Sequence, residues 1–146
     1  MGKYKTLRDR IYTLLNTNLV GSGLSVVSVN KAHNVVESGF PYITIGPSEV
    51  PSAFDTVVQN QRTYSFDVYV WSNVEDSDIG EASALDTIMD ITDLVINLLD
   101  ADFTLSGDAD AGVEPVPAQI RIFDGPAGKM IGSKIVVKCH TLHSFA

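Results

Sequence analysis

The stretch Arg62-Thr-Tyr-Ser-Phe-Asp-Val-Tyr-Val-Trp-Ser72 decides the fold of this chain. It is rich in aromatic and β-branched residues, and apolar residues recur at every second position, which is typical of a half-buried strand. The side predicted to face the core carries Tyr64, Phe66, Val68 and Val70. The opposite side carries Ser65, Asp67, Tyr69 and Trp71, because successive side chains of a strand point in opposite directions.

Two stretches with helical periodicity flank this strand in the sequence. Residues 5–18 repeat apolar residues at three- and four-residue spacing, and Gly21-Ser22-Gly23 follows as a stop signal. Residues 78–99 carry a longer apolar stripe, and Asp78 with Glu81 three residues later resembles a capping box. The stripe of this second helix consists of Ile79, Ala82, Leu85, Ile88, Met89, Thr92, Val95, Ile96 and Leu99.

Further strands are predicted on both sides of these elements, in residues 24–30, 40–46, 118–124 and 131–145. The order of helices and strands predicts an α+β fold, with a mostly antiparallel β-sheet and two helices packed on one face. We expect residues 1–146 to form a single domain, because this length suits one hydrophobic core.

Two segments interrupt this order. Residues 47–61 contain Pro47 and Pro51, which break regular structure, yet they also carry several apolar side chains. We therefore expect a projecting hairpin or loop arm there. Residues 100–117 are dominated by Asp, Gly, Ala and Pro, which predicts a loop.

Composition excludes several classes of function. The chain has 146 residues, of which 45% are hydrophobic and 19% charged, as in ordinary globular proteins. Its one cysteine, Cys139, excludes an intrachain disulfide framework and a multi-cysteine metal site. The net charge of -8 argues against an open nucleic-acid-binding surface, which requires clustered Lys and Arg. No signal-peptide pattern or run of 18 apolar residues is found, so we expect no membrane contact.

The acidic residues are distributed unevenly. No Lys or Arg occurs between Arg62 and Arg121, and this interval holds 13 of the 18 acids. They are Asp67, Glu75, Asp76, Asp78, Glu81, Asp86, Asp90, Asp93, Asp100, Asp102, Asp108, Asp110 and Glu114. Such a surface either keeps a helix face soluble, or it repels a polyanion or meets a basic partner.

The sequence contains no pattern of catalytic, cofactor-binding or metal-binding residues. Asp100-x-Asp102 begins like a calcium loop, but Ala111 stands where that loop needs its final acid. His140 and His143 are three apart in a predicted strand, so they point to opposite faces and cannot share a metal. We therefore expect no enzyme activity and no cofactor.

Three pieces of this sequence resemble the tail terminator, or tail-completion, proteins of long-tailed bacteriophages. The first is Phe40-Pro-Tyr-Ile-Thr-Ile-Gly46, and the second is the long strand that ends in Trp71-Ser72. The third is the helix of residues 78–99, which follows that strand after a short polar loop. The first helix and the last two strands also fall in the order of that family.

The resemblance implies a structural role in a virion. Such proteins assemble into a ring, commonly a hexamer, on the last ring of a tail tube, and they stop its polymerisation. The ring joins the tail to the head connector, and DNA passes through it. The implied partners are further copies of the chain, the tail-tube protein and the connector or neck protein. The implied location is the head–tail junction of a virion that is assembled in the host cytoplasm.

Two sets of residues are candidates for these contacts. Apolar side chains of the expected arm are suited to insertion into a neighbouring subunit, and they are Val50, Phe54, Val57 and Val58. An acidic wall would let DNA slide without tight binding of its phosphates. We expect part of the acidic stretch to line or flank the lumen, and the candidates are Asp86, Asp90 and Asp93.

Three other functions remain open at the level of sequence. A neck or head-completion protein would share the ring and the virion but contact the portal side. An acidic inhibitor that mimics nucleic acid would be a monomer or dimer bound to a basic enzyme. A small hydrolase or metal-dependent enzyme would need acidic ligands clustered near a histidine, and the sequence offers no such cluster.

Overall fold

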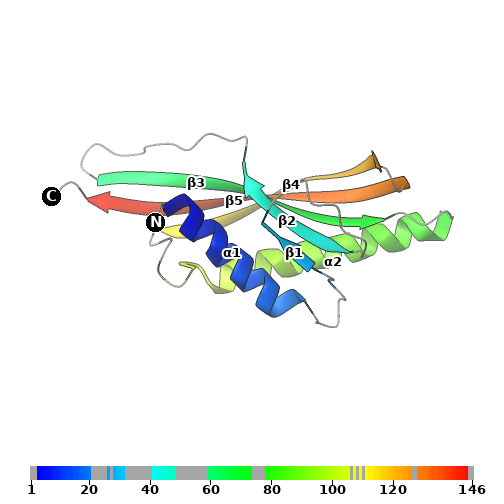
Figure 1. The fold of residues 1–146 in the computed structure, drawn as a ribbon, viewed down its shortest axis with the longest axis horizontal. Coiled ribbons are helices and arrows are strands. Elements are labelled where there is room, and N and C mark those ends of the chain that lie inside the picture. The colour runs from blue at the N-terminus through cyan, green and yellow to red at the C-terminus, as the bar shows by residue number, and fades with distance from the viewer. Residues whose placement is uncertain are drawn as a thin grey trace.

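The computed structural model describes residues 3–20, 26, 28–31, 41–48, 59–73, 78–105, 107, 109, 111–125 and 128–144. Two helices and five strands lie along an elongated molecule (Figure 1). In chain order they are α1 (Lys3–Leu19), β1 (Ser28–Asn30), β2 (Tyr42–Pro47), β3 (Gln59–Asn73), α2 (Asp78–Ala101), β4 (Gly112–Gly125) and β5 (Gly128–Ser144).

The strands form one sheet in the order β1-β2-β3-β5-β4. Only β1 and β2 are parallel, and the other three neighbouring pairs are antiparallel. Strand β3 pairs with β5 along the whole length of β3, from Gln59 opposite Ser144 to Asn73 opposite Met130. The predicted α+β fold with a mostly antiparallel sheet is therefore confirmed.

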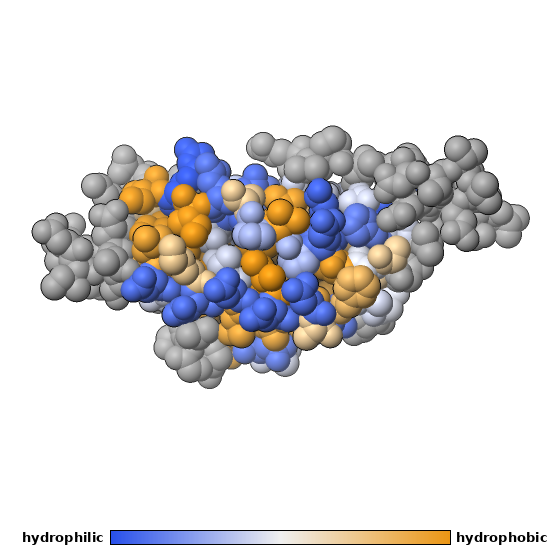
Figure 2. Space-filling model, turned by 180° about the vertical axis from the view of Figure 1, so that it is seen from behind, coloured by the Kyte–Doolittle hydropathy of each residue, from blue (hydrophilic) through white to orange (hydrophobic). Residues whose placement is uncertain are grey.

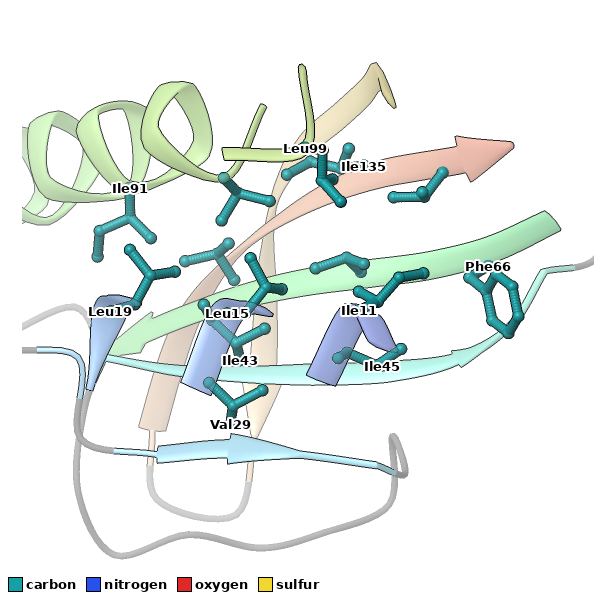
Figure 3. Packing of buried hydrophobic residues seen from close by; sticks show 14 of the residues in the cluster. Ile11, Leu15, Leu19, Val29, Ile43, Ile45, Phe66, Ile91, Leu99 and Ile135 are labelled. Carbon is teal, nitrogen blue, oxygen red and sulfur yellow. The ribbon is translucent and has the colours of Figure 1, made fainter. Parts of the chain in front are cut away.

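Both helices pack against the same apolar side of the sheet. Helix α1 contacts β1 and β2, whereas α2 contacts β3, β4 and β5. In Figure 3, Leu15 of α1 lies beside Ile43 of β2, and Ile91 and Leu99 point from α2 towards the same space. All four side chains are fully buried. The two helices thus share one hydrophobic core, which the sheet closes on the other side.

Strand β3 shows the alternation predicted from its sequence, with one difference. Phe66, Val68 and Val70 are buried in the core, as predicted. On the other side of the strand Ser65 and Asp67 are also buried, although a polar alternate face is normally solvated. The two larger residues of that face, Tyr69 and Trp71, are half-buried and stack with ring centroids 5.1 Å apart.

The apolar stripe predicted for α2 is correct at its centre and wrong at one edge. Ile88, Thr92, Val95 and Leu99 are buried as predicted. Met89, however, leaves 44% of its surface exposed, and Ile91, which the prediction omitted, is fully buried. The buried row is rotated slightly around the helix, because α2 rests across β3, β5 and β4 and also packs against α1.

The prediction of a loop throughout residues 100–117 is wrong, because β4 already begins at Gly112. Pro115 and Pro117 suggested a loop, but prolines are tolerated in an edge strand, whose outer side needs no hydrogen-bond partner. The pairing of β4 with β5 shifts register between Pro117 and Gln119. The prolines and this bulge protect the first half of the edge from further strand pairing.

The expected arm at residues 47–61 is shortened at both ends. Pro47 is the last residue of β2, and Gln59 already begins β3. Ser48 extends the ladder, because its backbone N–H donates to the carbonyl of Ser65 at 3.0 Å. The candidate contact residues of the arm lie outside the described residues; they are Val50, Phe54, Val57 and Val58.

Candidate interaction surfaces

The exposed side of α2 is an acidic surface. Asp86, Asp90 and Asp93 are all exposed, and their spacing of four and three residues places them on one side of the helix. All three carboxylates therefore face away from the core. Helix α2 contains no Lys or Arg, so no cation of its own neutralises them. None of the described residues forms a salt bridge with the three carboxylates.

Helix α1 carries charge of the opposite sign. Its sequence contains four basic residues and a single acid, Asp9. The Arg8 guanidinium bonds Asp9 at 3.0 Å and Lys31 approaches the same oxygen at 3.3 Å. The hydrogen bond from Arg8, aided by Lys31, holds the pKa of Asp9 below its usual value. The acid is thus fully engaged by cations, and the remaining surface of α1 is positive.

A hollow of about 300 Å³ opens beside the first turns of α1, and we call it the aromatic hollow. It is lined by Tyr4, Lys5, Arg8, Pro47 and Phe66. The ring of Tyr4 packs edge-on against Phe66 with centroids 5.0 Å apart, and its hydroxyl donates to the carbonyl of Ser65 at 3.0 Å. These contacts fix the aromatic floor, although 38% of Tyr4 remains exposed.

Exposed apolar side chains gather where α2 meets the edge strand β4. Met89, Ile120 and Ile122 are 44%, 41% and 51% exposed, and we call them the apolar strip. The Thr92 hydroxyl lies 2.8 Å from that of Ser133 on β5, and Ser133 pairs with Ile120 on β4. Met89 precedes Thr92 by one helical turn, so these contacts place it beside the edge of the sheet.

The view from behind shows how this surface is divided. Hydrophobic side chains gather in patches that rows of hydrophilic side chains separate (Figure 2). The end that carries the β4–β5 hairpin, at the right in Figure 1 and the left in Figure 2, shows one such patch. Isolated apolar side chains are common on protein surfaces, but a group of three on an edge strand and its helix marks a candidate contact.

Two side chains with possible catalytic chemistry, Cys139 and His140, lie on opposite faces of β5. Cys139 is buried in the core, and burial raises the pKa of its thiol to about 12, so it stays protonated. His140 lies on the opposite face of β5, where its ring meets Thr63 at 2.9 Å and Glu114 at 3.4 Å. Within the described ranges, no group of three or more His, Cys, Asp or Glu side chains could hold a metal ion.

The open side of the sheet carries one buried ion pair. Lys134 lies 3.7 Å from one carboxylate oxygen of Asp67, and only a small fraction of Asp67 is exposed. The second oxygen of Asp67 and the hydroxyl of Ser65 find no hydrogen-bond partner among the described residues. A buried pair of this kind contributes little net stability, because desolvation offsets most of its attraction.

Sequence reasoning found the acidic side of α2 but missed the apolar strip and the aromatic hollow. The strip had a signal, since Gln119-Ile-Arg-Ile122 alternates polar and apolar residues as an edge strand does. No sequence pattern indicates the aromatic hollow, because it joins residues of α1, β2 and β3. Two of them, Tyr4 and Phe66, are 62 positions apart. Only the fold brings them together.

No described helix is both long enough and apolar enough to cross a membrane. Comparison with known proteins found no family model and no curated protein that matches this sequence. Among solved structures, the fold is similar to one chain of the "Virion of native gene transfer agent (GTA) particle". The TM-score is 0.51 and the identity 14%, over 93% of this chain and 94% of that chain. At this identity the likeness concerns the fold, and it extends over nearly the whole of both chains.

Proposed function

We propose that this chain is a structural virion protein that forms a ring at the end of a tail tube. The ring, commonly a hexamer in proteins of this kind, stops tube polymerisation and joins the tail to the head connector. One observation carries the proposal: nearly the whole fold overlaps a chain from a virion particle. The likeness of residues 40–46, 62–72 and 78–99 to phage tail terminators narrows the role within the particle.

The described surfaces support a structural rather than an enzymatic role. The single thiol is buried and protonated, and His140 is engaged by Thr63 and Glu114. The prominent surface features are instead an acidic helix face and exposed apolar side chains at a sheet edge. Features of this kind serve recognition and assembly, since they supply charge and apolar area but no reactive group.

We assign the acidic side of α2 to the wall, or the flank, of the DNA channel. Duplex DNA carries one negative charge per about 1.7 Å of its axis, so basic walls would bind it and slow its passage. Asp86, Asp90 and Asp93 present three exposed carboxylates on one helix face instead. Particles with Asp90→Lys should still assemble but should deliver DNA more slowly, and unchanged delivery kinetics would remove this assignment.

The ring itself is tested by microscopy and by mass measurement. The purified protein is imaged by negative stain and weighed in solution, alone and after mixing with tail tubes of the same particle. The proposal expects rings with a central hole, or caps on tube ends, and shorter tubes when the protein is present during polymerisation. A protein that stays monomeric and leaves tube ends bare would contradict the ring and the capping role together.

The same experiment separates the terminator from a neck protein. A ring that binds the head connector but leaves tube growth unchanged would place the chain on the portal side of the junction. A ring that stops tube growth would keep it on the tail side. One preparation is divided into two samples. Purified connector is added to the first to measure binding, and polymerising tail tubes are added to the second to measure whether growth stops.

A further inference from the structure

We propose that the apolar strip of one subunit docks on the aromatic hollow of the next, as the two sides of one head-to-tail contact between copies of this chain. The inference rests on the proposed ring and names the surfaces that build it. The two surfaces lie towards opposite edges of the sheet, since α1 packs against β1 and β2 whereas β4 is the edge strand at the other end of the order β1-β2-β3-β5-β4. A ring contact requires two such different and non-overlapping patches.

The strip is the side of the contact that projects. Ile120 and Ile122 stand on the edge strand beyond the bulge, in the half of β4 that contains no proline. The first half of this edge is protected by Pro115 and Pro117, whereas the second half has no strand partner on its outer side among the described residues. Soluble proteins rarely leave an open edge with exposed β-branched residues unless a partner covers it.

The hollow is the side of the contact that receives. Its floor consists of Tyr4 and Phe66, which pack edge-on against each other, and Pro47 closes one side. A second edge-on contact joins Tyr4 to Tyr64 with ring centroids 5.2 Å apart. The aromatic floor is therefore held in place before docking, which reduces the entropy that association costs.

Charge selects this pairing over others. Asp86 and Asp93 lie three residues before and four residues after Met89, so they border the strip on the helix surface, between it and Asp90, which lies further round the helix on the channel side. Lys5 and Arg8 line the hollow; Asp9 offsets part of the Arg8 charge, so Lys5 supplies most of the net positive charge there. Docking strip on hollow therefore brings carboxylates to cations. Docking strip on strip would bring carboxylates together, and docking hollow on hollow would bring cations together, so two-fold pairing is disfavoured.

One cation, Arg121, is next to the strip in the sequence but not on its surface. Arg121 lies between Ile120 and Ile122 in β4, but alternate residues of a strand point to opposite faces. Its side chain therefore lies on the open side of the sheet, away from the strip and from α2. The helix side of this edge keeps its acidic border.

Charge swapping tests the contact directly. Ile120→Lys with Ile122→Lys places cations opposite Lys5 and Arg8, and Lys5→Glu with Arg8→Glu places acids opposite the acidic border of the strip. Each double variant should raise the protein concentration at half-assembly by about 30-fold or more, as expected for loss of a central contact. Sedimentation and negative-stain images of purified protein, alone and on tail tubes, report the assembly.

The chain that carries all four substitutions is the decisive variant. Its strip gains two cations and its hollow gains two acids, so rings should form again at a lower protein concentration than either double variant needs. Val116→Lys with Gln119→Lys is the matched control, because both positions are exposed on β4 but lie on the open side of the sheet. That control should assemble like the original protein. Circular dichroism of each variant at low concentration verifies that the subunit is folded.

The outcomes separate this inference from the proposed function. If the original protein and both double variants all form rings, the proposed contact is wrong, but the proposed ring assembly is retained. Failure of the strip variant alone, with normal assembly of the hollow variant, would indicate two-fold pairing and would also overturn it. If the original protein forms no ring, with or without tubes, both the proposed contact and the proposed function are wrong. Loss in each double variant and recovery in the fourfold variant establish the contact.

Discussion

Gly112 is the residue whose backbone most constrains the start of β4. Its φ angle of +104° lies in a region that L-residues rarely adopt, and the Phe103 ring packs over its Cα. An added Cβ would come within 2.4 Å of that ring. Gly112→Ala should therefore lower the free energy of unfolding by about 2–4 kcal/mol, from backbone strain plus displacement of the ring.

Gly107 provides the control for this prediction. Its φ angle is +94°, but an added Cβ would meet nothing within 4 Å. Gly107→Ala therefore carries backbone strain alone and should cost about 1–2 kcal/mol. Urea unfolding of both variants measures the difference. Equal losses in the two proteins would mean that Phe103 moves aside without cost and that the packing over Gly112 is loose.

The Cys139 thiol makes stability depend on pH in the alkaline range. Burial raises its pKa from the ordinary value of 9.0 to about 12. Above pH 9 the unfolded chain loses this proton and the folded chain keeps it, so stability falls as the pH rises, by up to about 1.4 kcal/mol per unit. Below pH 9 the thiol is protonated in both states, and its contribution is fully present.

The test compares the original protein with Cys139→Ala, because lysines and tyrosines also titrate in this range. Urea unfolding at about pH 8 and about pH 10.5 should show about 2 kcal/mol more loss in the original protein than in the variant. Other alkaline effects are shared by both proteins and cancel. Parallel losses would indicate that the thiol gains solvent contact in the folded state.

For single residues, burial was predicted correctly where a periodic pattern of apolar residues extends over several turns or positions. Phe66, Val68 and Val70 follow from alternation alone. Ser65 and Asp67 do not, because their burial depends on what packs over the open face of the sheet. Met89 shows the same limit on a helix, where a shift of one position in the buried row turns a core residue into a surface residue.

At the scale of elements, α2 combines a stable buried face with an exposed face that works against its own stability. Asp86 and Asp90 are four residues apart, a spacing at which like charges repel. Asp90→Lys converts this pair into an attractive one and removes repulsion with Asp93. The isolated subunit should gain about 0.5 kcal/mol in its free energy of unfolding, even though DNA delivery is expected to suffer.

Asn97→Lys is the matched variant for this helix. Asn97 is exposed on the same side, and a lysine there would lie four residues after Asp93. It should stabilise the isolated subunit by a similar few tenths of a kcal/mol while leaving all three acids in place. Urea unfolding at low protein concentration compares the two. A clear loss of stability in Asp90→Lys would mean that Asp90 supports the fold itself.

The helices and the central strand were predictable because their periodic patterns are long. The edge strand β4 was not, since Pro115 and Pro117 carry the sequence signature of a loop. What makes them acceptable is the position of β4 at the sheet edge, and that position is set by pairing with β5 rather than by local preference. The aromatic hollow was unpredictable for the same reason, because it exists only where three separate elements meet.

At the scale of the whole molecule, the shared core predicts that the chain unfolds as one unit. Leu15 of α1 and Ile91 of α2 belong to the same buried cluster, which also includes Ile135 of β5 (Figure 3). A single core of this kind couples helices and sheet, whereas two domains would each need a core of their own. Leu15→Ala should therefore weaken the entire molecule by about 2–5 kcal/mol, and not α1 alone.

Amide hydrogen exchange measures this coupling site by site. In Leu15→Ala the most protected amides, including those of Ile91 and Ile135, should lose the same free energy of protection as urea unfolding reports for the whole subunit. Thr17→Ala, on the exposed side of the same helix, should leave all of them within about 0.5 kcal/mol of the original. Faster exchange confined to α1 would instead show that the first helix opens independently, and it would make the aromatic hollow a movable part of the subunit. Uniform loss would mean that the hollow, the strip and the acidic face are held at fixed positions by one core, as a ring with a repeated contact requires.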